Sequence, residues 1–551
     1  MSSEAPVSTP SGFHQAIALD RLPDFRRLAR DYAAGTATLA PFFAGDPSRA
    51  DDWRAAIARV RGRSPVTRGI ADVLATQLRA RQAPAAALDA VERLRDPQSV
   101  AIVTGQQAGL FGGPLFTLLK ALTAVRLAAD IARRFEVACE AVFWVDAEDH
   151  DWDEVRGCSV LDGNLERRTI SLPADTAPQN VPVGNRVLDQ QITAALDALA
   201  GTMAETDFTA SLLDQLREAW RPGSTMAAAF SRWLESILGT RGLIVFDASD
   251  AAAKPLVAEV FARELASAGR TAQLATEAGR RLTGLGYQAQ VMPQPDGVAL
   301  FRLDGGRHAL RHDGEQLSWG TSSETADGLE ADARAHPDRY SPNVLLRPIV
   351  QDTLFPTVAY IAGPSELAYL GQLKGVYEFF DVPMPLIYPR ATATILDAGA
   401  SRFLDRYGVA VETLQARDEQ SLNRLLQAQL PASVERAFEE ARHTLRERLA
   451  ALGDAVTAVD PTLAGTAKST LARMEKDLST FQGKLIQAAK RRDETLRRQF
   501  ARTQALLFPD GQLQERALGI VYFLNRYGPA LIDRLEAELP LQTTDHILLS
   551  I

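Results

Sequence analysis

Two short apolar runs, separated by a glycine-rich turn and one helix, constrain the fold more than any other feature of this chain. The first run spans 99–104 and ends at Gly105, and the second spans 141–145 and ends in a series of acidic residues. Between them, after Pro114, residues 115–134 carry apolar side chains at helical spacing. Two buried strands joined by a helix make a βαβ unit, so the sequence predicts an α/β fold with a parallel sheet.

The alternation of strands and helices recurs farther along the chain and predicts the extent of the core. Helical periodicity and Ala-rich segments predict an N-terminal helical region over 1–95. Strand and helix patterns then alternate over 96–410. They are interrupted near 157–240 and near 270–335 by mixed segments that we interpret as insertions into the core.

A charged helical segment follows the predicted core. Over 411–510, two runs, which include Leu452, Met474 and Phe481, have apolar residues at alternating spacings of three and four, the period of a coiled coil. Residues 453–465 are the predicted tip of the hairpin, and 511–551 are predicted to return and pack on the core. The alternative is a pair of ordinary bundle helices. Coiled-coil arms commonly pair with a second copy of the chain, so we expect a homodimer.

Charge, hydropathy and cysteine content narrow the class of protein. The chain has 60 Lys and Arg against 69 Asp and Glu, a net charge of −9, which disfavours nonspecific binding of nucleic acid. It has no uninterrupted apolar stretch of about 18 residues and no secretion signal at its N-terminus, so we expect no membrane association. The two cysteines, Cys139 and Cys158, suit unpaired thiols in a reducing compartment, which predicts a cytoplasmic protein.

The turn after the first apolar run is the first candidate site. Glycines let backbone N–H groups approach a ligand, and the start of the following helix favours an anion. The spacing fits neither the dinucleotide fingerprint nor a Walker A loop, because Lys120 lies well inside the helix. We favour a nucleotide or substrate site, and the alternative is a turn that only packs strand against helix. The candidate residues are Thr104, Gly105, Gln106, Gln107, Gly109, Gly112 and Gly113.

The acidic run after the second strand is the second candidate site. Six acids and one histidine occupy the nine positions from Asp146 to Glu154. Such a cluster can orient an amine, hold Mg²⁺, or use His150 as a general base. The alternative is a solvated acidic loop. The candidate catalytic residues are Glu148, Asp149, His150 and Asp151.

A third group of polar residues follows later predicted strands at 344–346 and 385–388. Its arginines can bind carboxylate or phosphate through two parallel hydrogen bonds, or can instead be buried partners of neighbouring acids. Ser365 is the predicted N-cap of a helix over 366–380. The candidate substrate-binding residues are Arg347, Gln351, Asp352, Ser365, Glu366, Tyr369 and Arg390.

Taken together and in this order, these motifs resemble the cysteine ligase of bacillithiol biosynthesis, the cysteine-adding enzyme family. The resemblance covers nearly the full length, including the helical arm and the 514–516 segment. Gly112 stands where we expect a threonine in the family pattern. The motifs are Gly105-Gln106-Gln107-x-Gly109-Leu110-Phe111-x-Gly113-Pro114 with Thr117 and Lys120, Phe143-Trp144 through Asp151, Arg347-Pro348 with Gln351-Asp352, Gly363 to Tyr369, and Pro389-Arg390.

The resemblance implies both a fold and an activity. The implied fold is a Rossmann-like core akin to class I nucleotidylyl transferases, with insertions and a dimer-forming C-terminal coiled coil. The implied reaction joins cysteine, through its carboxyl group, to the amine of glucosaminyl-malate. ATP or another adenine nucleotide is the simplest activator, and no metal ion is assigned.

Our hypothesis for the site combines the resemblance with the residue chemistry. The 106–113 loop would hold a phosphate or adenylate, the acids 148–151 would bind the amine with His150 as base, and Arg347 or Arg390 would receive the malate carboxylates. Two alternatives are a metal-dependent hydrolase that uses the acid–histidine cluster and a non-catalytic nucleotide-binding scaffold. The hypothesis requires all three segments to meet at the carboxyl edge of one sheet.

Overall fold

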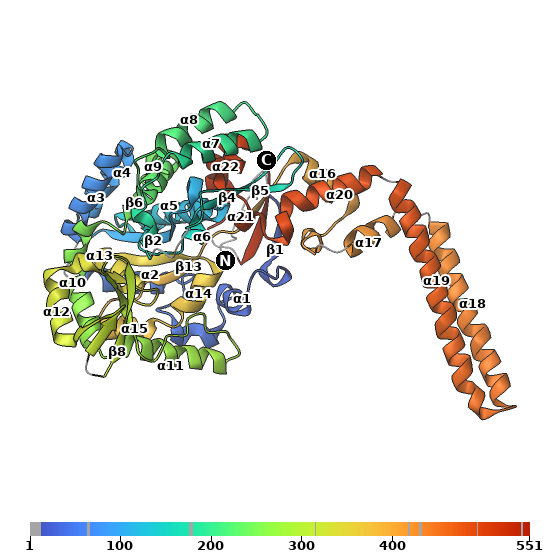
Figure 1. Ribbon diagram of the computed structural model, residues 1–551. Helices are drawn as coiled ribbons and strands as arrows, with labels where there is room; N and C mark the ends of the chain where they lie inside the picture. The colour runs from blue at the N-terminus through green and yellow to red at the C-terminus, as the bar shows by residue number, and fades with distance from the viewer. Residues whose placement is uncertain are drawn as a thin grey trace, which may run out of the picture. The chain divides into compact units, whose positions relative to one another are not determined.

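A five-stranded parallel sheet forms the centre of the fold (Figure 1). The computed structural model describes residues 13–62, 67–175, 180–314, 316–416, 419–428, 432–492, 494–541 and 544–551. In spatial order, the strands are β13 (Leu386–Pro389), β12 (Thr357–Ala362), β2 (Val100–Gln107), β3 (Cys139–Asp146) and β6 (Ile244–Asp247). The chain adds β3 and β6 on one side of β2, and then β12 and β13 on the other. This is the order of a doubly wound sheet, so the predicted Rossmann-like α/β core is confirmed.

Side chains from helices cover both faces of this sheet, which explains why its strands read as continuous apolar runs. On one face, the Phe143 ring lies 6.0 Å from that of Phe230 in α9 (Met226–Leu238). On the other face, Trp144 and Phe246 belong to a core that includes residues of α3 (Thr67–Arg81) and α4 (Ala85–Leu94). The crossover from β2 to β3 is α5 (Leu115–Phe135).

Two long connections interrupt the parallel sheet. The connection from β3 to β6 contains α6 (Trp152–Val155), the hairpin β4 (Gly157–Leu161) and β5 (Arg167–Ser171), α7 (Gln191–Thr202), α8 (Thr209–Ala219) and α9. The connection from β6 to β12 contains an antiparallel sheet of order β10-β9-β8-β7-β11. Its strands are β7 (Gly297–Leu303), β8 (Arg307–Asp313), β9 (Gln316–Trp319), β10 (Ser322–Thr325) and β11 (Tyr340–Pro342), and its helices are α10 (Ala258–Ala266), α11 (Arg270–Gly284), α12 (Ala326–Ala335) and α13 (Arg347–Leu354).

The prediction of a strand at 344–346 is wrong. The Asn343 side chain accepts hydrogen bonds from the backbone N–H groups of Leu345 and Leu346, at 2.9 and 3.3 Å, just before α13 begins. Pro348 then occupies the first turn, where its missing N–H costs nothing. The central strand of this region is β12, which the sequence interpretation did not assign.

The predicted helix over 366–380 is two helices, α14 (Pro364–Leu370) and α15 (Lys374–Phe380). Its N-cap is Gly363 rather than Ser365, because the Glu366 carboxylate accepts the Gly363 N–H at 2.7 Å. Glu366 therefore caps the helix that carries it.

The N-terminal region is not wholly helical. Its described part begins with β1 (Phe13–Ala18), which pairs antiparallel with β15 (Asp545–Ser550) in a three-stranded sheet with β14 (Ala393–Leu396). Residues 1–12 of the predicted helical region lie outside the described residues. The helices of this region are α1 (Arg27–Ala33), α2 (Ala50–Arg61), α3 and α4, and those of the C-terminal segment are α21 (Gln514–Ala517), α22 (Ile520–Tyr527) and α23 (Ala530–Glu538).

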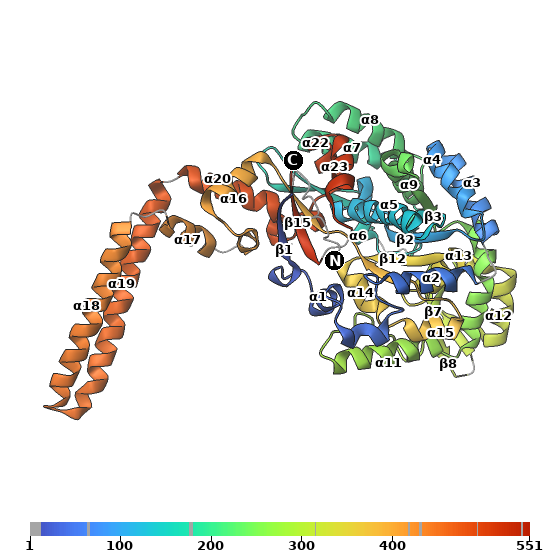
Figure 2. The same cartoon turned by 180° about the vertical axis from the view of Figure 1, so that it is seen from behind.

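The chain divides into two compact units, 1–395 with 513–551, and 396–512. The second unit contains α16 (Ala398–Tyr407), α17 (Gln420–Ala428), α18 (Ala432–Thr457), α19 (Ala464–Arg492) and α20 (Glu494–Leu507). Helices α18 and α19 lie side by side in both views (Figures 1 and 2), where the Arg446 guanidinium donates to Glu475 at 2.6 Å. No helix among the described residues has the length and apolar character needed to cross a membrane.

Two details of this helical hairpin differ from its prediction. Helix α18 continues through Gly453 to Thr457, so the tip is shorter than 453–465. The side chains of Leu452, Met474 and Phe481 are 53%, 40% and 62% exposed. They therefore stay largely open to solvent, although the Phe481 ring still contacts the ring of Phe438 in α18, with their centroids 5.7 Å apart.

Candidate active site

A cavity of about 680 Å³ lies at the carboxyl ends of β2, β3 and β12. This position is the switch point of the doubly wound sheet, where the strand order reverses and where such folds bind ligands. All three predicted segments contribute to what we call the strand-end cavity. The predicted residues that line it are Gly105, Gln106, Gln107, Asp149, His150, Arg347, Ser365, Glu366, Tyr369 and Arg390.

The glycines of the predicted phosphate loop lie outside this cavity. The N–H groups of Gly109, Gly112 and Gly113 already donate within the loop, at 2.9 to 3.1 Å, so they are not available to a ligand. Gly112 has φ +94°, and a Cβ there would lie 2.7 Å from the Trp233 indole nitrogen, so the expected threonine would not fit without a shift. These three glycines therefore offer no free backbone donor, which supports the alternative of close packing, and phosphate binding by the rest of the loop stays a prediction.

Thr104 also has a structural role. It is fully buried, and its hydroxyl donates to the Ile361 carbonyl at 3.1 Å, which ties β2 to β12. At the cavity end of β2, Gly105 approaches Trp144 so closely that a Cβ would lie 2.7 Å from the Trp144 carbonyl oxygen. The strand end, rather than the glycine loop, therefore contributes to the cavity.

Asp149 and His150 face the cavity and are held by residues from other segments. The Asp149 carboxylate accepts hydrogen bonds from the Gln107 amide at 2.8 Å and from the Arg307 guanidinium at 3.3 Å. Arg307, at the start of β8, also lies 3.3 Å from His150 Nδ1. Because arginine only donates, its contact with Nδ1 favours the tautomer that carries its proton on Nε2 and donates it into the cavity. Nδ1 also lies 3.4 Å from the Asp149 carboxylate, which favours the other tautomer, and the role of His150 as a base stays a prediction.

Arg307 was not predicted, and its surroundings fix it firmly. It is buried, its guanidinium lies 3.8 Å from the centre of the Phe301 ring, and it donates to the Pro342 carbonyl at 2.9 Å. A cation beside both Asp149 and His150 repels a metal ion at that position, which argues against the hydrolase alternative. No group of three His, Cys, Asp or Glu side chains in the described part of the chain is placed to hold a metal ion.

Two predicted catalytic acids have structural roles instead. Glu148 is buried and forms an ion pair with Lys254. Asp151 is the N-cap of α6, where its carboxylate accepts the Glu154 N–H at 3.2 Å. Neither lines the cavity.

Two other acids of the same run do line the cavity. Asp146 ends β3, and burial raises the pKa of its carboxyl although Arg347, at 3.9 Å, opposes the shift. Burial likewise raises the pKa of Glu154, and the negative charges of Asp151 and Asp149 add to it. A carboxylate with a raised pKa is a better proton acceptor, so these two are the stronger base candidates.

Lys120 and Glu366 form a buried ion pair in the cavity wall. The Lys120 ammonium donates to Glu366 at 2.6 Å and to the Gly105 carbonyl at 2.5 Å. Burial alone would raise the pKa of Glu366, but Lys120, the Gly363 N–H and the Tyr360 hydroxyl together hold it below its ordinary value. Burial also lowers the pKa of Lys120, against the attraction of Glu366. The pair links β2, α5 and α14.

Both arginines predicted to bind substrate already have partners. Arg347 donates to Gln351 at 3.0 Å and to the Tyr369 hydroxyl at 3.1 Å, in addition to its contact with Asp146. Arg390 forms two hydrogen bonds with Glu515, at 2.5 and 3.1 Å, and both side chains are buried.

Gln351 and Asp352 lie behind the cavity wall rather than in it. The Gln351 amide donates to Asp352 at 2.9 Å, and the Tyr377 hydroxyl donates to the same carboxylate at 2.5 Å. Burial raises the pKa of Asp352 to about 6. These residues support Arg347 and are not in position to contact a substrate.

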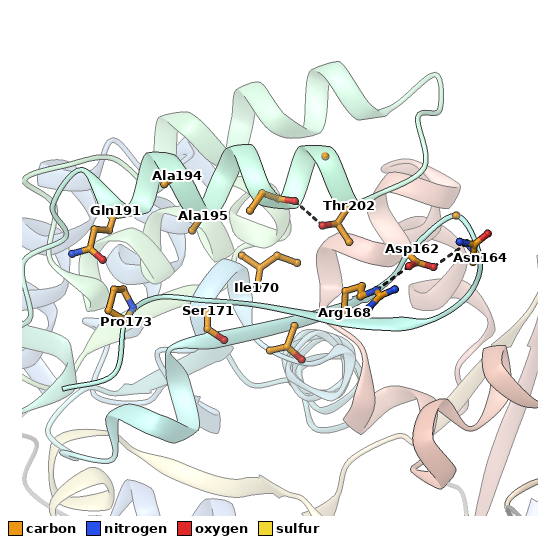
Figure 3. A pocket seen from close by; sticks show the side chains of 14 residues that line it. Asp162, Asn164, Arg168, Ile170, Ser171, Pro173, Gln191, Ala194, Ala195 and Thr202 are labelled. Atoms are coloured by element: carbon orange, nitrogen blue, oxygen red, sulfur yellow. Dashed lines mark hydrogen bonds and ion pairs between the residues drawn. The ribbon is translucent and has the colours of Figure 1, made fainter. Parts of the chain in front are cut away.

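A second cavity, of about 800 Å³, lies elsewhere on the same unit (Figure 3). It lies between the β4–β5 hairpin and α7, and we call it the hairpin groove. Small side chains such as Ala194 and Ala195 line its helix side, and Asp162 and Arg168 pair at 3.0 Å at its other end. None of the predicted site residues lines it.

The fold and the strand-end cavity define a Rossmann-like α/β protein with a charged cavity at the switch point of its sheet. Comparison with known proteins makes the assignment specific. Residues 15–391 match the family model "Bacillithiol biosynthesis BshC, N-terminal Rossmann-like domain", and residues 393–551 match "Bacillithiol biosynthesis BshC, C-terminal coiled-coil domain". The chain belongs to the BshC family.

Several relatives resemble the chain over almost its whole length, and each bears the name "Putative cysteine ligase BshC". The Salinibacter ruber protein is 33% identical over 98% of this chain and 99% of its own. The Koribacter versatilis protein is 33% identical over 94% and 96%, and the Geobacillus kaustophilus protein is 31% identical over 94% and 96%.

Proposed function

We propose that this chain is an amide-forming ligase that joins the carboxyl group of cysteine to the amine of glucosaminyl-malate, giving bacillithiol. Membership of the BshC family and the names of its relatives support the class of reaction. The observation that carries the proposal is the convergence of Asp146, Asp149 and Glu154 on one cavity. These acids suit an ammonium group, which must lose a proton before it can act as a nucleophile.

The proposed step forms a bond between the amine nitrogen and the activated carboxyl carbon of cysteine. The bond from that carbon to its leaving group, a phosphate or adenylate supplied by an activating nucleotide as co-substrate, breaks, and the amine gives up a proton. We assign the proton to Asp146, with Glu154 as the second candidate, because burial raises the pKa of both. Asp149 would bind the amine, and the Nε2–H of His150 would donate to the carbonyl oxygen as negative charge develops there.

The proposal assigns no nucleotide to the glycine loop. The N–H groups of Gly109, Gly112 and Gly113 are already used, so these three glycines offer no free donor to a phosphate. The proposal therefore names no residue that binds the activating nucleotide, and the requirement for ATP is one arm of the test.

The test is an assay of the purified full chain with cysteine and glucosaminyl-malate, with and without ATP, followed by mass spectrometry. We expect bacillithiol in at least one arm. Asp146→Asn should abolish most of the product, whereas Asp162→Asn in the hairpin groove should leave it unchanged. Absence of product in both arms, from folded protein, contradicts the proposed function.

We also propose that the chain forms a cytoplasmic homodimer through α18 and α19. Met474 and Phe481 are seven residues apart on α19, so they share one helix face, and both are exposed apolar side chains that a second copy would cover. Cys139 and Cys158 are both free, as the cytoplasm permits.

Light scattering of the full chain tests the homodimer. We expect twice the chain mass for the wild type and for the polar control Thr480→Glu. The single chain mass is expected for the double variant Met474→Glu, Phe481→Glu. A monomeric wild type, or a dimer that survives the double variant, would contradict this interface.

A further inference from the structure

One cationic side chain in the strand-end cavity has no acidic partner within the described part of the chain. Five cations line the cavity, and four of them are paired with carboxylates: Lys120 with Glu366, Arg307 with Asp149, Arg347 with Asp146, and Arg390 with Glu515. The fifth is Arg516. Its guanidinium makes no ion pair or hydrogen bond with any residue that the structure describes.

The position of Arg516 is nevertheless well defined. Its guanidinium carbon lies 5.7 Å from the centre of the Phe116 ring, and that of Arg390 lies 5.4 Å from the same ring. A contact with an aromatic ring uses none of the N–H groups of a guanidinium as hydrogen-bond donors to an oxygen, so they stay available to an anion. Nearby, the Gln514 side chain bonds both the N–H and the carbonyl of Ile395, at 2.8 and 3.0 Å, so α21 is anchored to the core.

The cavity also has one acid without a cationic partner. Of the four acids that line it, Asp146, Asp149 and Glu366 form ion pairs, whereas Glu154 forms none with the described residues. One unmatched positive group and one unmatched negative group remain. An occupant that carries both an amine and a carboxylate complements this arrangement.

We infer that Arg516 binds a carboxylate of the malate group and thereby selects glucosaminyl-malate over sugars that lack it. The inference rests on the proposed function for the identity of the substrate. Arg347 and Arg390 are poorer candidates, because a carboxylate would have to displace their buried partners, and breaking a buried ion pair is costly. Arg516 would form a charge-assisted bidentate contact without that loss.

The test is a comparison of kinetics for Arg516→Gln with two substrates, glucosaminyl-malate and the methyl glycoside of glucosamine, which has the amine but no carboxylate. We expect KM for glucosaminyl-malate to rise about 10- to 100-fold. KM for cysteine and for the methyl glycoside should stay within about 2-fold of wild type. For Arg516→Lys, KM for glucosaminyl-malate should lie between the values of the wild type and of Arg516→Gln. Arg168→Gln in the hairpin groove serves as the control and should leave this KM unchanged.

The outcomes separate this inference from the proposed function. If product forms and Arg516→Gln leaves KM for glucosaminyl-malate unchanged, or raises it equally for both sugars, the inference is wrong and the ligase assignment stands. If the wild type forms no product, calorimetric binding of glucosaminyl-malate decides. Binding by the wild type and by Arg168→Gln that is lost in the Arg516 variants supports the inference. Equal affinity of all these proteins, or no binding by the wild type, overturns it. Urea unfolding of each variant checks that the fold is retained.

Discussion

The strand-end cavity and the hairpin groove are of similar size, but they are built in different ways. Residues from Gly105 to Arg516 meet in the first, and seven of its nine charged groups are paired, four of them buried. Residues 162–202, a single stretch of chain, line the second, and its Arg168 side chain is 55% exposed. Holding charges in a buried wall costs free energy that exposed ion pairs do not incur. Dense, desolvated charge at a strand end is therefore the better sign of a functional site than cavity volume.

The largest expected effect is on catalysis. Asp146→Asn should lower kcat about 10²- to 10⁴-fold, because the amide cannot accept the proton of the attacking amine. Asp162→Asn, at the hairpin groove, should leave kcat within about 2-fold of wild type. Steady-state kinetics of bacillithiol formation measures both. A kcat for Asp146→Asn close to that of the wild type would show that Asp146 is not the proton acceptor. Glu154, the second candidate, would then be tested with Glu154→Gln.

The next effect is on stability, and it contrasts one arginine from each cavity. Arg307→Gln removes a buried cation and leaves Asp149 uncompensated, so we expect a loss of about 3–5 kcal/mol in the free energy of unfolding. Arg168→Gln removes an exposed ion pair and should cost less than about 1 kcal/mol. Urea denaturation followed by circular dichroism provides the comparison. Equal losses would show that the charge network of the strand-end cavity contributes no special stability.

The two regions should also respond to pH with opposite sign. Burial raises the pKa of Asp352, behind the strand-end cavity, from 3.8 to about 6. Its stabilising contribution is therefore present below about pH 4 and lost as the pH rises through about 6, a change on the order of 3 kcal/mol. Backbone N–H groups and Arg168 lower the pKa of Asp162, in the groove. The contribution of Asp162 to stability is therefore present above the ordinary pKa of an aspartate and is lost as the pH falls through the lowered pKa.

Unfolding curves of wild type, Asp352→Asn and Asp162→Asn between pH 3 and pH 8 measure these contributions as differences. The free energy of wild type minus that of Asp352→Asn should decrease with rising pH, and the corresponding difference for Asp162→Asn should increase. If the two differences changed with pH in the same direction, the Asp352 carboxyl would have to be solvated or paired with a cation in the folded protein, contrary to its buried position.

The smallest effect compares two glycines. Gly112→Ala places a Cβ 2.7 Å from the Trp233 indole in a left-handed backbone conformation, and should destabilise the fold by about 2 kcal/mol. Gly163, in the hairpin groove, has open space around its Cα, so Gly163→Ala should be nearly neutral. Thermal melting measures both. Because Gly112 lies outside the strand-end cavity, kcat of its variant should not change at a temperature where the protein is folded.

Several features of the site were predictable because they depend on neighbours in the sequence. The apolar runs before Gly105 and before Asp146 mark strands, and polar residues at both strand ends were expected to meet. The individual roles were less predictable. Glu148 and Asp149 are adjacent in the chain, yet Lys254 neutralises one while the other faces the cavity.

The residues that sequence reasoning missed come from distant segments. Arg307 lies in the inserted antiparallel sheet and has no motif around it that marks a ligand. Arg516 lies in a segment noted only for its resemblance to the family, and that resemblance assigned it no role. Asp146 and Glu154 belong to the predicted acidic run, and the tertiary structure distinguishes them by placing both on the cavity wall with a raised pKa.

Local periodicity was sufficient to determine the α/β alternation, the paired helices of α18 and α19, and the polar character of the strand ends, because each depends on side chains a few residues apart. Only the tertiary structure decided which charges remain available to a ligand. Glu515, 125 positions away in the chain, pairs with Arg390, whereas Arg516, the residue after Glu515, has no acidic partner among the residues that the structure describes. The physical reason is that the availability of a charge depends on the nearest opposite charge in space, which its position in the chain does not reveal.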